Sequence, residues 1–223
     1  MNLKRVCTPL TLVLTALVFF QSVSLFFFHE GYAHDTMPGA QTTAPDTYER
    51  VEQMYSLPDV TLMNQDGVKV RFKNLVDSGK PVILNFIFTS CTTICPLLAT
   101  AFSRLQIIMG EEADHVTLIS ISSDPDHDSP PIMKEYLHRL GAKPGWEFLT
   151  GTPEDIAQVM KAFDAQVGNK MDHFPLKFLH APGAADQWVR LNGLIGGSRL
   201  IEEYRKLLNS PQDTVPSGDS DHV

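Results

Sequence analysis

The sequence predicts an α/β domain in which a central sheet is covered by helices on its faces. Two continuous apolar runs, residues 82–88 and 115–122, are typical of strands that are buried on both sides. A segment with helical spacing of apolar residues follows each run, and later segments continue the alternation. Strands that alternate with helices indicate a sheet with helices packed against it.

The first half of the domain supplies a hairpin and the two central strands. Residues 58–62 and 68–72 are β-prone and flank Asn64-Gln65-Asp66-Gly67, which is a hairpin signature. The strand at 82–88 follows, and then a helix is expected over 91–110, ending at Gly110. The second buried strand comes next.

The second half continues with shorter elements. An amphipathic helix is predicted over 131–140, a short strand over 146–149 and a helix over 153–163, with Thr152 as its N-cap. Residues 177–179 and 188–191 are typical of a late strand pair, and 200–208 of a final helix. The predicted order is therefore hairpin, β-α-β-α-β-α, then β-β-α.

The amino terminus predicts export. Lys4 and Arg5 precede a long apolar run, which ends before Gly31-Tyr32-Ala33. We interpret residues 1–33 as a signal peptide or an N-terminal membrane anchor, because the run is also long enough to span a bilayer. Residues 34–54 are expected to form a polar linker, 55–209 the folded domain and 210–223 a disordered tail.

Composition excludes several functional classes. The chain has 223 residues and a formal net charge of -8, which argues against a nucleic-acid-binding protein. Three cysteines exclude a scaffold held by several disulfides. Since Cys7 lies in the leader, the domain contains a single pair, Cys91 and Cys95.

That cysteine pair is the candidate site. Cys91 and Cys95-Pro96 lie where a buried strand turns into a helix, and the free N–H groups and dipole of a helix start stabilise a thiolate. The alternatives are a structural disulfide or two small buried apolar side chains. Two soft thiolates favour a soft metal, and one imidazole would complete a three-coordinate Cu(I) site. Among the eight histidines, His173 and His180 lie near the predicted late strand, and their spacing alone does not choose between them.

Four local patterns resemble a known family. They are Cys91-x-x-x-Cys95-Pro96 after a buried strand, Ser123-Asp124-Pro125 followed by Asp128, the pair Asp172-His173, and the turn Ala181-Pro182-Gly183. Over residues 58–208 the chain resembles the Sco/SenC family of thioredoxin-fold copper-binding proteins.

The resemblance implies a thioredoxin-like fold, with a central mixed sheet flanked by helices and an N-terminal β-hairpin. It also implies that Cys91, Cys95 and His173 bind a copper ion. Asp124 is expected either to lie near the cysteines and tune their charge or to form a capping turn before Pro125. Two positions depart from the family pattern: Thr92 stands where members often have Pro, and His180 stands where an Asp is common. His180 is thus a further potential ligand or a pH-sensitive neighbour.

Three functional hypotheses use these residues. The resemblance implies a copper metallochaperone that serves the CuA centre of a cytochrome c oxidase subunit, in the bacterial periplasm or on the outer face of the cytoplasmic membrane. The second hypothesis is a thiol–disulfide oxidoreductase in which Cys91 attacks and Cys95 resolves. The third is a redox or copper sensor. A peroxidase is disfavoured, because no arginine partner is evident beside Thr89 and Cys91.

Overall fold

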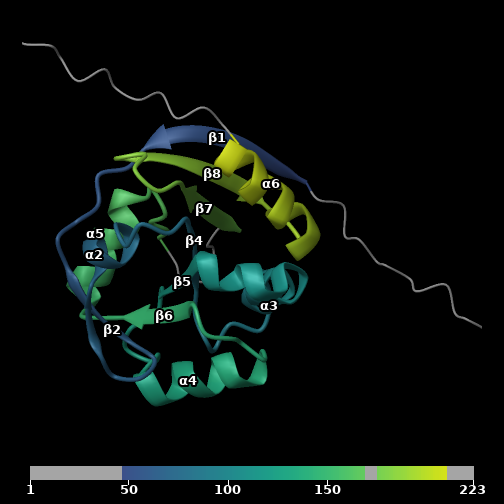
Figure 1. The fold of residues 1–223 in the computed structure, drawn as a ribbon. Helices are drawn as coiled ribbons and strands as arrows, with labels where there is room; N and C mark the ends of the chain where they lie inside the picture. The colour runs from purple at the N-terminus through teal and green to yellow at the C-terminus, as the bar shows by residue number, and fades with distance from the viewer. Residues whose placement is uncertain (1–46, 169–174, 210–223) are drawn as a thin grey trace, which may run out of the picture. The chain divides into compact units, whose positions relative to one another are not determined.

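An eight-stranded sheet runs through the part of the chain that the computed structural model describes, residues 47–168 and 175–209 (Figure 1). Its strand order is β1-β8-β7-β4-β5-β6-β2-β3, and the central strands β4, β5 and β6 are parallel, whereas the other pairs are antiparallel. The strands are β1 (Tyr48–Met54), β2 (Thr61–Asn64), β3 (Lys69–Arg71), β4 (Val82–Ile87), β5 (Thr117–Ser122), β6 (Trp146–Thr150), β7 (Leu176–His180) and β8 (Gln187–Gly193).

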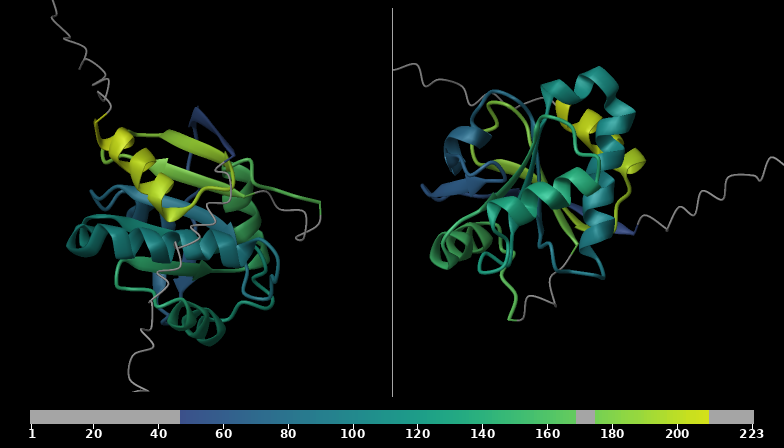
Figure 2. Two further views of the ribbon diagram at one scale, coloured as in Figure 1. Left: turned by 90° about the vertical axis from the view of Figure 1, so that its right-hand side faces the viewer. Right: turned by 90° about the horizontal axis from the view of Figure 1, so that it is seen from below.

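Helices cover both faces of this sheet (Figures 1 and 2). The helical elements are α2 (Phe72–Val76), α3 (Cys95–Met109), the 3-10 helix η1 (Gly110–His115), α4 (Pro130–Arg139), α5 (Pro153–Ala162) and α6 (Gly197–Asn209). Buried residues of α3, α4 and α6 join one hydrophobic cluster, and those of α2 and α5 join a second cluster on the opposite face. The predicted mixed sheet flanked by helices is confirmed.

The local sequence signals explain most of these boundaries. All six residues of β4 and all six of β5 are buried, as expected for strands covered on both faces. Thr152 caps α5 as predicted, because its hydroxyl oxygen accepts a hydrogen bond of 3.1 Å from the Asp155 N–H. The hairpin is also confirmed: β2 pairs with β3, and Gly67 adopts a φ of +76° in the turn between them.

The amino-terminal boundary of the domain differs from the expectation. Residues 48–54, which we expected in the polar linker, form β1 and pair with β8 along their whole length. Glu49 and Arg50 are both exposed and interrupt the alternation, so neither a continuous apolar run nor a strict alternation reveals this edge strand.

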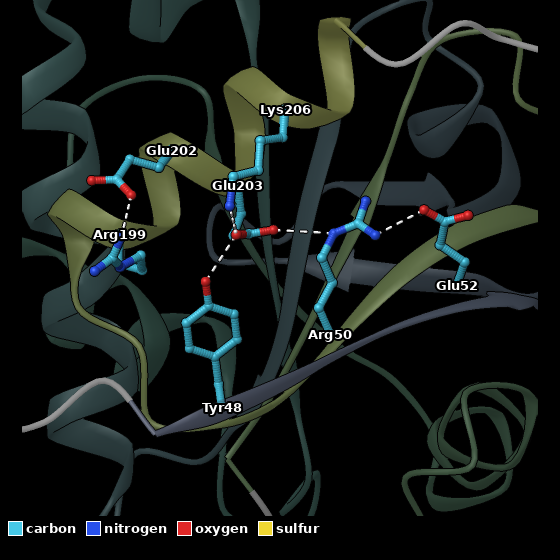
Figure 3. Close-up of polar contacts among 7 residues, drawn as sticks. All are labelled: Tyr48, Arg50, Glu52, Arg199, Glu202, Glu203 and Lys206. Carbon is cyan, nitrogen blue, oxygen red and sulfur yellow. Dashed lines mark hydrogen bonds and ion pairs between the residues drawn. The ribbon is translucent and has the colours of Figure 1, made fainter.

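A polar cluster fastens β1 to the carboxyl-terminal helix α6 (Figure 3). The buried carboxylate of Glu203 accepts hydrogen bonds from the Tyr48 hydroxyl at 2.8 Å, from Arg50 Nε at 3.1 Å and from Lys206 Nζ at 2.7 Å. The folded domain therefore includes a strand that precedes the predicted hairpin.

Three expected segments lie outside the described residues: the leader at 1–33, most of the linker and the tail at 210–223. Within the described ranges, no helix combines the length and the apolar character needed to cross a membrane.

Candidate metal centre

Both cysteines lie at the carboxyl end of the central strand β4, as the sequence predicts. The segment 88–94 leaves the sheet after β4, and the Cys91 N–H donates to the Phe88 carbonyl at 3.3 Å. α3 begins at Cys95, four residues later than expected, with Pro96 in its first turn, where a missing N–H costs no hydrogen bond. Neither cysteine forms a disulfide, and both are buried, with exposed fractions of 4% for Cys91 and 0% for Cys95.

The two sulfur environments differ because of the helix start. The Cys95 N–H points back and donates to Cys91 Sγ at 3.4 Å, and Thr93 Oγ1 lies 3.6 Å from the same sulfur. Cys91 is therefore the sulfur that receives the donors of the helix amino terminus.

These contacts separate the acidities of the two thiols. Burial opposes ionisation of Cys91, but hydrogen bonds from Cys95 and Thr93 outweigh it and lower the pKa of Cys91 to about 7. Burial raises the pKa of Cys95, and the neighbouring Cys91 and the charge of Asp128 raise it further. The arrangement therefore provides one nucleophilic sulfur and one protonated sulfur in contact.

Asp128 holds the loop that carries Cys91. Its carboxylate is fully buried and accepts hydrogen bonds from the Thr89 N–H at 3.2 Å, from the Thr89 hydroxyl, and from the Ser122 hydroxyl at 2.6 Å. Thr89 follows β4 and Ser122 ends β5, so this single carboxylate ties together two neighbouring strand ends. The sequence places Asp128 within a family pattern, but its role emerges only when the two strands are adjacent.

Asp124 forms a turn. Its carbonyl oxygen accepts hydrogen bonds from the His127 and Asp128 N–H groups at 3.0 and 2.9 Å, and its own N–H donates to Ser122 Oγ at 3.1 Å. This turn places Asp128 beside Thr89, in the loop that leads to Cys91. The carboxylate whose charge acts on Cys95 is that of Asp128.

The two candidate histidines have different outcomes. His173 lies outside the described residues, so its assignment as a ligand stays a prediction. His180 lies in β7, where side chains alternate between faces, and Leu179 belongs to the cluster that contains the cysteines. His180 instead stacks on Trp188, which belongs to the opposite cluster, at a ring distance of 4.6 Å, and its Nδ1 lies 3.0 Å from the Gln187 carbonyl oxygen.

The register of β7 therefore separates His180 from the cysteines, and its role as a further ligand has no support. Among residues 47–168 and 175–209, no third His, Cys, Asp or Glu joins the two sulfurs in a group that would hold a metal ion.

Comparison with known proteins identifies one family. The sequence model of the SCO1/SenC family matches residues 50–183. The SCO1 protein homolog of Bacillus subtilis (strain 168) is 29% identical over 171 residues, which cover 73% of this chain and 80% of that protein.

Solved structures agree. BsSco, a member of the Sco family of cytochrome c oxidase assembly proteins in which a disulfide switch was identified, has a TM-score of 0.59 at 28% identity, covering 70% of this chain and 95% of its own. Arabidopsis thaliana ScoI with copper bound has a TM-score of 0.55 at 27% identity, covering 69% of this chain and 99% of its own.

Proposed function

The chain belongs to the SCO1/SenC family, and from this premise we propose that it is a copper metallochaperone that delivers copper to the CuA centre of cytochrome c oxidase. The cargo is a copper ion held by Cys91, Cys95 and His173. The observation that carries the proposal is the pair of reduced sulfurs at the start of α3, within a fold shared with a copper-bound Sco protein. Thiolates and an imidazole suit Cu(I) better than they suit hard cations.

The position of the pair suits transfer to a client protein. Cys91 is covered, but its neighbours Thr92, Thr93, Pro96 and Leu97 are exposed, so a partner can approach this end of the sheet directly. A three-coordinate ion leaves room for an incoming client thiolate before the first donor leaves. The predicted leader supports the outer face of the cytoplasmic membrane as the place of this exchange.

A Cu(I) titration of the reduced full chain tests the ligand set. We expect one ion per chain for the natural protein. His173→Ala is expected to weaken binding by at least about tenfold, because even residues that only support a metal ligand contribute roughly 10–100-fold to affinity. His138→Ala, which removes an exposed histidine on α4, is the matched control. A chain that takes up no Cu(I), or a His173→Ala variant that binds as tightly as the natural protein, contradicts the proposal.

A second function is favoured by the unequal thiols. The Cys91 thiolate can attack a client disulfide and release one client thiolate, which takes the proton of Cys95; Cys95 then attacks the Cys91 sulfur and releases the second client thiolate. Two electrons pass to the client, and a Cys91–Cys95 disulfide remains. This reaction would prepare the client cysteines to receive copper.

Reduction of a peptide disulfide separates this function from copper delivery. A reductase keeps its rate in His173→Ala and loses it in Cys91→Ser, because only the sulfurs take part. Equal rates for the natural chain and Cys91→Ser exclude the reductase.

A further inference from the structure

A single peptide group, the one between Phe88 and Thr89, connects Asp128 to the backbone of Cys91. Its N–H belongs to Thr89 and donates to both oxygens of the Asp128 carboxylate at 3.2 Å. Its carbonyl belongs to Phe88 and accepts the Cys91 N–H at 3.3 Å. Because a peptide group is planar and rigid, fixing its N–H also fixes the direction of its carbonyl oxygen. The carboxylate therefore orients the group on which the Cys91 backbone rests.

The carboxylate is itself held firmly. It is 0% exposed and also accepts hydrogen bonds from the Thr89 hydroxyl and from the Ser122 hydroxyl, the latter at 2.6 Å. The N–H of Asp128 donates to the Asp124 carbonyl at 2.9 Å. Hydrogen bonds to an ionised acceptor are roughly twice as strong as neutral ones, and they polarise the bonds that continue the chain. The bond between Phe88 and Cys91 is therefore strengthened from Asp128.

The backbone of Cys91 sets where its sulfur lies relative to the start of α3. Cys91 Sγ accepts the Cys95 N–H at 3.4 Å and lies 3.6 Å from Thr93 Oγ1. The backbone of Phe88 also forms a hydrogen bond with the Cys95 thiol. Both cysteines therefore rest on Phe88, whose carbonyl is oriented from Asp128. Ligands that are held in the binding geometry beforehand bind a metal more tightly, because less ordering is needed on binding.

We propose that Asp128 is a positioning residue that holds the two cysteines in the arrangement that binds copper, and that it acts through the Phe88–Thr89 peptide group. The carboxylate supports the ligands without being one of them. The expected effect on copper rests on the proposed function, whereas the expected effect on the cysteine loop does not.

A role through charge alone predicts the opposite effect on copper. Both sulfurs must lose their protons when Cu(I) binds. The charge of Asp128 raises the pKa of Cys95, so removing that charge would by itself make loading easier and binding tighter. Loss of the positioning hydrogen bonds would make binding weaker. The sign of the change in affinity therefore separates the two roles.

The test uses Asp128→Asn, which keeps the size of the side chain but removes its charge and one of its two acceptor oxygens. Asp126→Asn is the matched control, because Asp126 is an exposed carboxylate in the same turn. Ser122→Ala removes a hydrogen bond to Asp128 but leaves the bonds to Thr89, so it reports the effect of lost stability alone. Cu(I) affinity is measured on the reduced full chain by competition with a coloured Cu(I) chelator. Amide hydrogen exchange at Cys91 and the Tm are measured on the reduced, metal-free chain.

Asp128→Asn is expected to weaken Cu(I) binding about tenfold, as is typical for residues that support metal ligands. Exchange of the Cys91 N–H should become about fivefold faster, because a neutral acceptor holds the peptide group less firmly than a carboxylate does. Asp126→Asn should change neither quantity. Ser122→Ala should lower the Tm and leave the affinity for Cu(I) unchanged.

Failure of the inference is distinguishable from failure of the proposed function. If the natural chain takes up no Cu(I), the proposed function fails, and unchanged exchange at Cys91 in Asp128→Asn would overturn the positioning role separately. If the natural chain binds Cu(I) and Asp128→Asn binds it equally or more tightly, only the positioning role is overturned. Equal weakening in Asp128→Asn and Ser122→Ala would show a general loss of stability, which also overturns it.

Discussion

At the scale of single residues, the chemistry of the site comes from a difference between two neighbouring cysteines. Cys91 precedes the first turn of α3 and receives its N–H donors, whereas Cys95 is the first residue of that turn and lies deeper. The same helix start therefore acts on the two sulfurs with unequal strength. Under the functions that we propose, a copper ion or a client disulfide would meet Cys91 first, because Cys91 is the more acidic thiol.

Alkylation of the reduced, metal-free chain checks this difference. The pKa of Cys91 is lowered to about 7, so its modification by iodoacetamide should rise with pH with a midpoint near that value. The pKa of Cys95 is raised above its ordinary value of 9.0, so Cys95 should stay unmodified at neutral pH. Peptide mass spectrometry assigns the label to each cysteine, and equal labelling of both at pH 7 would contradict the assignment.

The buried carboxylate of Asp128 supports the loop that carries Cys91, although Asp128 is not one of the proposed metal ligands. Its oxygens accept hydrogen bonds from Thr89 and Ser122, and these bonds stabilise the buried carboxylate. Burial is the main cause that raises the pKa of Cys95, and the nearby charge of Asp128 raises it further. One side chain therefore both holds the two strand ends together and raises the pKa of Cys95.

At the scale of elements, a polar contact joins the border strand β1 to the helix α6. Burial opposes ionisation of Glu203, but hydrogen bonds from Lys206 and Tyr48 and the charges of Lys206 and Arg50 outweigh it and lower its pKa. These partners come from a strand at one end of the domain and from the helix at the other. The cluster thus joins two segments that are 155 residues apart in the sequence, measured from Tyr48 to Glu203.

Replacing this carboxylate tests the contribution of the cluster. Glu203→Gln should lower the free energy of unfolding at pH 7 by roughly 1–3 kcal/mol, because it removes the buried charged acceptor of the hydrogen bonds from Tyr48, Arg50 and Lys206. Glu202→Gln is the matched control, since Glu202 forms an exposed pair with Arg199 and such pairs contribute roughly 0–1 kcal/mol. Urea unfolding measures both variants, and equal losses would contradict a special role for Glu203.

The same comparison has a defined pH dependence. A carboxylate whose pKa is lowered on folding stabilises the protein above its unfolded value, which is about 4.5 for glutamate, and loses that contribution as the pH falls through the lower folded value. The gap between the natural chain and Glu203→Gln should therefore stay constant near neutral pH and narrow below about pH 4.5.

At the scale of the whole molecule, the sequence predicts the elements whose apolar residues recur at a regular spacing. It misses the features that depend on contacts between segments distant in the sequence. The buried runs of β4 and β5 and the helical spacing of α3 identify the layered fold. The strand-to-helix junction likewise identifies both cysteines. β1 is missed because two consecutive exposed charges, Glu49 and Arg50, interrupt its alternation, and α2 is missed because five residues give no periodic signal.

The rest of the site is set by register and packing. Sequence spacing leaves His180 beside His173 as an alternative, and only the alternation of faces in β7 turns His180 toward Trp188. Tyr136 has the spacing of an ordinary core residue of an amphipathic helix. Its buried hydroxyl, which has no hydrogen-bond partner among the described residues, becomes evident only in the folded structure.

The two strands that border the sheet have a consequence for the protein in solution. β1 carries Glu49, Arg50 and Glu52 on one border, and β3, only three residues long, carries Lys69 and Arg71 on the other. Charged and short border strands discourage the edge-to-edge pairing that leads to aggregation. The border strands are thereby guarded against backbone pairing with other chains, which leaves the thiol end of the sheet as the place for the client contact that we propose.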